Sequence, residues 1–321
     1  MATRSERGVT RVLDKLEASV KSGQYYEAHQ MYRTLYFRYL SQKKYEDLLN
    51  LLYKGSTLLL EHDQQGSGAD LALLVIEVLL KAEIKPSDEW IEKLAKLFQL
   101  MNSSIPERET FLANAVKWSM DSNKRGHPLL HKKIAEVYWH ENKYTFAHRH
   151  FLHSGDGMTY ARMLIELHTN KGQKNEIDLF ITQAVLQFLC LRNLQMASET
   201  FDKYAELHPG IKNTKGPPYP YPLLNFSWFL LRAVEEKDKA QFKILKASYL
   251  LHLKREPNYF DYLDKIGCIW FGIPLPGSDR DANSMLGGLF KTIIGDVDSS
   301  DEEGVYEKNS ATVTASAPDL D

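Results

Sequence analysis

Apolar residues recur along most of this chain at the three- and four-residue spacing of α-helices. Between Ala69 and Ala82 they cover more than one face, which indicates a helix packed on several sides. In residues 88–101 they form a single stripe, made of Trp90 or Ile91, Leu94, Leu97, Phe98 and Met101. Long strand-like alternation hardly occurs. The pattern therefore predicts an all-α fold.

Glycine and proline divide this pattern at short intervals. The spaces between them suit helices of roughly 12 to 20 residues, so we expect an antiparallel succession of helices to about residue 272. The turn signals are Gly23, Gly55, residues 64–68, Pro86, Pro106, residues 125–128, Gly155, Gly157 and Gly172.

Three segments repeat one arrangement of large and small residues. Each has a tyrosine, followed at helical spacing by small, aromatic or aliphatic residues: Tyr25, Ala28, Tyr32 and Leu35; Tyr45, Leu48, Leu52 and Gly55; Tyr144, Ala147, Phe151 and Ser154. This is typical of the second helix of a tetratricopeptide-type pair, although the intervals are not the regular 34 or so residues. We predict a succession of irregular, degenerate tetratricopeptide-like helix pairs. Its tyrosines mostly pack between helices, with a binding face as the alternative.

The helical pattern of the sequence is interrupted after Leu207. Residues 208–222 hold five prolines and two glycines, so we expect either a long ordered excursion, which could include a small β-hairpin, or a flexible loop. We expect a disordered start at 1–8, solenoid halves at 9–155 and 156–272, and a linker with an apolar helix at 273–295. A disordered acidic tail, 296–321, follows.

Charge is distributed unevenly between body and tail. Residues 1–295, the body, carry a net charge near +5, and residues 296–321, the tail, carry a net charge near −7 with Lys308 as their single base. Together they give the net charge of −2. A body this weakly basic does not indicate nucleic-acid binding. An acidic tail is typically solvated.

Residue types that perform catalysis or hold metals form no recognisable arrangement. On a helix His148 and His150 point about 200° apart, so the histidines at 148–153 cannot offer three ligands to one ion. Residues 66–68 lack the lysine and the hydroxyl of a phosphate loop. We interpret them as a turn, with Asp70 near the N-terminus of the next helix. We expect no catalytic residue, no cofactor and no metal.

The cysteines and the apolar runs indicate in which cellular compartment the protein is found. Cys190 and Cys268 lie in apolar contexts far apart, as buried thiols in a reducing compartment would. The N-terminus has no secretory signal, and the apolar run at 71–80 is too short to span a bilayer. We expect a cytosolic protein that is not inserted into membranes.

The combination of segments is more specific than any one of them. "GQYYEAHQMYRTLYFRY", "GSGADLALLVIEVLLKAEI", "HPLLHKKIA", "FLHSGDG", "AVLQFLCLRN" and "PLLNFSWFLL" resemble the Golgi-to-ER traffic protein 4 family, over residues 10–295. The resemblance implies a right-handed α-solenoid that acts as a non-catalytic cytosolic adaptor in the guided entry of tail-anchored proteins, with indirect contact to the clients. It implies an N-terminal face for a homodimeric targeting ATPase. The C-terminal half would hold a ubiquitin-like adaptor in fungi, or in animals a BAG-family chaperone scaffold that it retains in the cytosol.

The resemblance also places partner-binding residues. On the ATPase face these are Lys15, Tyr25, Arg33, Arg38 and Asp70, and solvated faces are the alternative for Arg33 and Arg38. For the scaffold or adaptor, the apolar segment after the proline-rich excursion suggests aromatic and aliphatic anchors, with internal packing as the alternative: Tyr219, Tyr221, Leu223, Leu224, Phe226 and Trp228. Ser299 and Ser300 precede acids and are predicted phosphorylation sites.

Two other classes of protein remain as alternatives to this adaptor. A helical-repeat subunit of another large cytosolic assembly, such as a proteasome-lid-type scaffold, would normally end in a winged-helix module with strands, and residues 257–295 show no strand pattern. An enzyme with an unrecognised helical active site is the second alternative.

Overall fold

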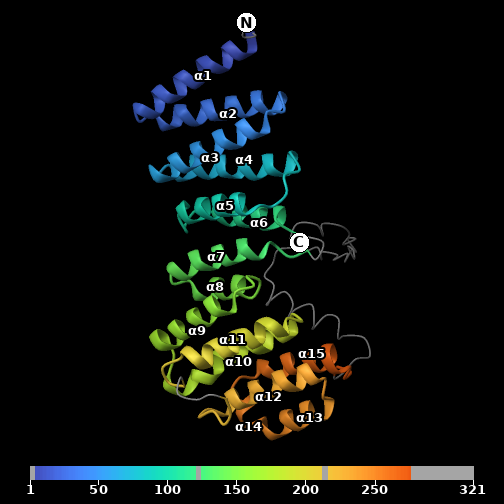
Figure 1. The fold of residues 1–321 in the computed structure, drawn as a ribbon. Coiled ribbons are helices and arrows are strands. Elements are labelled where there is room, and N and C mark those ends of the chain that lie inside the picture. The colour runs from blue at the N-terminus through green and yellow to red at the C-terminus, as the bar shows by residue number, and fades with distance from the viewer. Residues whose placement is uncertain (1–3, 121–123, 212–215, 276–321) are drawn as a thin grey trace, which may run out of the picture.

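The computed structural model describes residues 4–120, 124–211 and 216–275, with side chains from residue 11 onward. In these ranges the chain forms fifteen α-helices and one 3-10 helix, Lys174–Glu176, and no strand (Figure 1). The α-helices are α1 (Arg4–Lys21), α2 (Tyr25–Ser41), α3 (Tyr45–Glu61), α4 (Gln65–Lys81), α5 (Asp88–Leu100), α6 (Glu107–Trp118), α7 (Pro128–His140), α8 (Tyr144–Phe151), α9 (Gly157–Lys171), α10 (Ile177–Cys190), α11 (Leu194–Leu207), α12 (Pro222–Glu236), α13 (Lys239–Ser248), α14 (Leu250–Leu253) and α15 (Asn258–Phe271).

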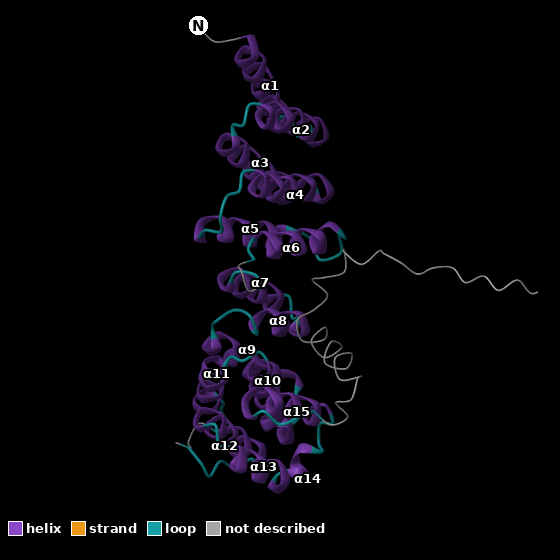
Figure 2. Ribbon diagram, turned by 90° about the vertical axis from the view of Figure 1, so that its right-hand side faces the viewer, coloured by secondary structure: helices purple, strands orange, loops and turns teal. Residues whose placement is uncertain are grey.

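The helices stack on one another into an elongated column. α1 packs on α2, α3 on α4 and α7 on α8, and the pairs follow each other from one end of the molecule to the other (Figures 1 and 2). In the last part of the column α10 is surrounded by α9, α11, α12 and α15. This arrangement confirms the all-α solenoid. The described part of the 208–222 excursion contains no strand, so the β-hairpin is not found there.

The repeated spacing marks positions that face neighbouring helices. Ala28, Tyr32 and Leu35 are buried on α2. The corresponding residues of α3 and α8 are buried as well, and so is Ser154 just after α8: Leu48, Leu52 and Gly55; Tyr144, Ala147 and Phe151. However, α3 is the first helix of its pair rather than the second. The first and second helices of a pair share this spacing because each helix of the stack packs against one helix before it and one after it.

Several glycines that resemble turn signals lie within helices. Gly55 is in the middle of α3, and Gly66 and Gly68 are in the first turns of α4. A Cβ on Gly55 would lie 2.6 Å from the Tyr32 ring, and one on Gly68 would lie 2.6 Å from Leu60 Cγ. Close approach of helices explains Gly55 and Gly68. Because α4 already begins at Gln65, Asp70 lies in its second turn, and the expected position at the helix terminus is wrong.

This contact gives a testable prediction. Gly55→Ala should lower the free energy of unfolding by about 1–3 kcal/mol, because the new methyl group must displace the buried Tyr32 ring. Gly66→Ala is the matched control: nothing lies within 4 Å of the position that its Cβ would take, and alanine favours the helix by up to about 1 kcal/mol. Urea unfolding of both variants measures the difference. Equal stability of the two would contradict the close approach.

Candidate partner-binding surfaces

A polar seam joins α2 to α4 at the N-terminal end of the column. His29 is buried, and its Nε2 lies 2.7 Å from Asp70 Oδ2. Arg33 Nη1 donates to the other carboxylate oxygen, Asp70 Oδ1, at 2.8 Å. One carboxylate thus fixes two side chains of the neighbouring helix, and it holds the Arg33 guanidinium at the surface.

The seam continues two turns further along both helices. The Tyr36 hydroxyl donates to Glu77 Oε1 at 3.0 Å, and Lys81 Nζ donates to the same oxygen at 2.6 Å. Burial, followed by the Glu77 carboxylate, raises the pKa of Tyr36, so its hydroxyl stays protonated and remains a donor. The α2–α4 contact is therefore fixed by polar groups at two levels.

Beside the seam, α2 exposes a row of residues that we call the α2 stripe: Tyr26, Gln30, Arg33 and Phe37. Their spacing of four, three and four residues places them on one face of the helix. Tyr26 is 73% exposed and Phe37 is 61% exposed. Exposed aromatic residues on both sides of an arginine are typical of protein-binding surfaces.

The residues expected on the ATPase face are only partly brought together. Arg33 and Asp70 form an ion pair, whereas the half-buried Tyr25 stacks on His62 at the end of α3, with ring centroids 4.9 Å apart. Lys15 is exposed on α1 and Arg38 is exposed near the end of α2. The sequence analysis did not identify Tyr26 and Phe37. Both lie off the buried face of α2, and the three- and four-residue spacing of that face could have shown that they are exposed.

Most residues expected to hold the scaffold belong to the interior. Leu223, Leu224 and Phe226 are buried in α12, and Tyr219 is buried with its ring edge-on to Phe201. Asn225 binds the backbone of the excursion, accepting from Tyr219 N at 2.7 Å and donating to Tyr219 O at 2.9 Å. The first four residues therefore stabilise the fold. Of the six, only Tyr221 and Trp228 are partly exposed.

The other end of the column exposes a second apolar set, which we call the tip patch: Ile244, Leu250 and Leu251 on α13 and α14. Ile244 is 64% exposed and Leu251 is 78% exposed. Next to Leu250 is a cavity of about 450 Å³ between α13 and α15, lined in part by Phe242, Lys246 and Leu263. The sequence signal was the number of aliphatic residues between 244 and 253, which is larger than one packed face requires: Ile244, Leu245, Leu250, Leu251 and Leu253.

Among the residues that the structure describes, no three histidine, cysteine or acidic side chains are placed to hold a metal ion. Burial raises the pKa of the Cys190 thiol to about 12, which leaves it a poor nucleophile. Burial also lowers the pKa of His148 to about 4, and its Nδ1 contacts the Tyr160 hydroxyl at 2.5 Å. These groups pack the interior.

None of the helices in the described ranges combines the length and apolar character that a bilayer span requires.

The stacked helix pairs define an α-solenoid protein with exposed apolar side chains at both ends. More particularly, the chain belongs to the Golgi to ER traffic protein 4 family, whose sequence pattern matches residues 42–293. It is 49% identical to the Golgi to ER traffic protein 4 homolog of Oryzias latipes, over 95% of this chain and 94% of that protein. The Homo sapiens homolog is 48% identical over 94% of this chain and 91% of its own length. The crystal structure of C. therm. Get4 superposes with a TM-score of 0.77 and 25% identity, covering 88% of this chain and 96% of that one. The family assignment confirms the resemblance and associates the chain with ER-directed traffic.

Proposed function

We propose that the protein is a non-catalytic adaptor in the delivery of tail-anchored membrane proteins to the endoplasmic reticulum. It connects a chaperone complex that holds the client to the homodimeric ATPase that carries the client onward. It acts in the cytosol and contacts the client only indirectly. The ATPase is assigned to residues 9–155 and the chaperone scaffold to residues 156–272.

One observation carries this proposal. Among the described residues, the four most exposed large apolar side chains are Tyr26, Phe37, Ile244 and Leu251. They belong to α2, α13 and α14, which lie near the two ends of the column (Figure 1). An elongated protein with a contact surface at each end can hold two partners without a clash between them. Exposed large apolar residues are more often partner contacts than solvated surface when they gather at one place.

The two surfaces differ in character, and this supports the assignment. The α2 stripe includes Arg33, whose ion pair with Asp70 is partly exposed, so binding there should weaken as salt rises. The tip patch is apolar and adjoins a cavity, as a long-lived contact requires. Because the vertebrate relatives are 45–49% identical, we assign the animal-type partner, a BAG-family scaffold with its ubiquitin-like adaptor, to the C-terminal half.

Two surface variants test the proposal. Tyr26→Ser/Phe37→Ser should weaken ATPase binding by roughly thirtyfold or more, because two exposed aromatic anchors are removed. Ile244→Ser/Leu251→Ser should weaken scaffold binding similarly. Each variant should retain the other partner and the melting temperature of the unaltered protein. Binding of purified partners, measured by interferometry with and without added salt, gives these results.

A matched control is Phe146→Ser, which removes another exposed aromatic residue, on α8 in the middle of the column. It should leave both partners bound. If both end variants bind both partners normally, or if Phe146→Ser has the same effect, the two-ended assignment is wrong.

A further inference from the structure

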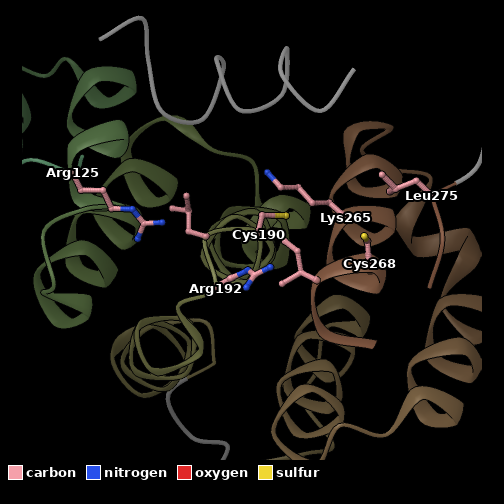
Figure 3. Close-up of a pocket in the computed structure, with 8 residues that line it drawn as sticks. Arg125, Cys190, Arg192, Lys265, Cys268 and Leu275 are labelled. Carbon is pink, nitrogen blue, oxygen red and sulfur yellow. The ribbon is translucent and has the colours of Figure 1, made fainter. Parts of the chain in front are cut away.

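A small basic pocket lies beside α15, and none of its lining residues belongs to the α2 stripe, to the tip patch or to the cavity next to that patch. It has a volume of about 250 Å³ and is formed by the segment before α7, the α10–α11 turn and α15 (Figure 3). Arg125 and Arg192 lie on one side of it, and Lys265 and Leu275 lie on the other, with Cys190 between them. Leu191 and Ile269 add apolar surface. Of the described residues that line it, three are cationic and none is acidic.

The chemistry of this basic pocket suits a peptide that is both apolar and acidic. Its volume is below the roughly 300–1,000 Å³ of most small-molecule sites. Arg125 and Arg192 are exposed, so their charges are available to an anion at the mouth of the pocket. Leu191 is buried, and Ile269 and Leu275 are partly exposed, so the apolar side of the pocket can receive a few side chains.

The chain itself contains such a peptide, and it begins at the pocket. Leu275 is the last described residue and lines the pocket. Ten residues later the sequence becomes apolar, with Met285, Leu286, Leu289, Phe290, Ile293 and Ile294, and then acidic, with Asp296, Asp298, Asp301, Glu302 and Glu303. Ten residues span at most about 35 Å, so the pocket is well within reach.

We propose that residues 285–303 of the same chain dock on this basic pocket. The apolar side chains pack against Leu191, Ile269 and Leu275, and the acids that follow pair with Arg125 and Arg192. Apolar burial and opposite charge then act together, as they do in recognition of acidic-apolar peptides. A direct consequence is that the docked segment covers Cys268, which lines the pocket and is exposed in the described part of the chain.

The reactivity of Cys268 tests this docking without any partner protein. The chain has two cysteines, and Cys190 is buried with a raised pKa, so iodoacetamide should modify Cys268 alone in the folded protein. In the full-length chain we expect at least a tenfold faster reaction after Leu289→Ser/Phe290→Ser/Ile293→Ser or after Arg125→Glu/Arg192→Glu. The Cys268→Ser chain should show no reaction, which identifies the modified thiol.

Matched controls separate docking from a general charge effect. Lys43→Glu/Lys44→Glu makes the same change of charge at the exposed α2–α3 turn and should leave the rate unaltered. Replacing Asp296, Asp298 and Asp301 by lysine in the Arg125→Glu/Arg192→Glu chain should restore slow reaction. Equal rates in the unaltered chain and in both pocket and tail variants would overturn the proposal. Protection that depends on protein concentration would also overturn it, because the occupant would then be a second copy.

Discussion

At pH 5 the protein should be largely unfolded under conditions of urea and temperature in which it is folded at pH 7.5. The physical cause is a cluster of histidines between α7 and α8. His131 is buried, its Nδ1 lies 2.9 Å from His150 Nδ1, and its ring centroid is 5.2 Å from that of His153. Two protonated rings at this distance would repel each other strongly, and burial disfavours even one.

The pKa values of these histidines follow from that packing. Burial lowers the pKa of His150 to about 3 and that of His153 to about 4, and neighbouring cations, Arg149 and Arg125 among them, add to the effect. Burial, and then His150, His153 and His127, hold the pKa of His131 well below its usual value. His148, on the same helix as His150, behaves similarly for the same main reason.

The direction in which pH changes the stability depends on proton uptake by the unfolded chain. Above pH 6.5 the histidines are neutral in both states, so they do not change stability. As the pH falls below 6.5 the unfolded chain takes up protons that the folded chain cannot, and stability falls until the pH approaches about 4. Each histidine contributes about 1.4 kcal/mol per pH unit, so four of them can remove a typical stability of about 5–15 kcal/mol within this window.

Urea midpoints between pH 7.5 and 4.5 measure the proton uptake directly. His150→Gln/His153→Gln should flatten the pH dependence by nearly two protons, because glutamine does not titrate. His140→Gln is the control: this residue is exposed on α7 and should leave the slope unchanged. A midpoint that stays constant between pH 7.5 and 5 would contradict the role of the cluster.

The second large effect concerns a buried carboxylate near the C-terminal end of the column. Asp178 is fully buried in the first turn of α10 and accepts hydrogen bonds from Arg255 Nη1 at 3.0 and 3.1 Å and from Leu223 N at 3.3 Å. Arg255 Nη2 also donates to the carbonyl of Asn175. These bonds fasten the α14–α15 turn and the start of α12 to α10.

Arg255→Ala should therefore lower stability by about 3–5 kcal/mol, because it leaves a buried carboxylate without its cation. Arg255→Lys should recover only part of the loss, since an ammonium group cannot reproduce the paired contacts of the guanidinium. We expect scaffold binding to decline while ATPase binding survives, because the damage is confined to the last helices. Thermal melting and the two binding assays check both parts.

Arg232→Ala provides the matched control for this prediction. Arg232 pairs with Glu235 one turn away, and both side chains are more than half exposed, so the pair contributes only up to about 1 kcal/mol. If Arg255→Ala and Arg232→Ala melt alike, the buried network does not stabilise the column's end.

The sequence by itself determined the class of fold. The apolar spacing placed the helix 88–101 almost as the structure has it, with α5 at Asp88–Leu100, and it identified the packed faces of α2, α3 and α8. This succeeds because helix geometry is local: residues three and four apart must share a face whatever lies beside them. The family resemblance added the traffic role, which helical spacing alone does not contain. The apolar helix 284–295, the acidic tail, Ser299 and Ser300 lie outside the described residues and stay predictions, as do the domain boundaries.

The tertiary structure alone decided which side chains remain available. Phe226 and Trp228 look equally suitable as anchors in the sequence, yet the first is buried and the second is partly exposed. Gly68 looked like a turn and is a close contact, because Leu60 of the preceding helix occupies the space beside it. Asp70 looked like a helix terminus group and is the partner of His29 and Arg33, 41 and 37 residues away. Such pairings depend on how helices stack, and a sequence of alternating helices and turns is compatible with many stackings until side-chain packing selects one.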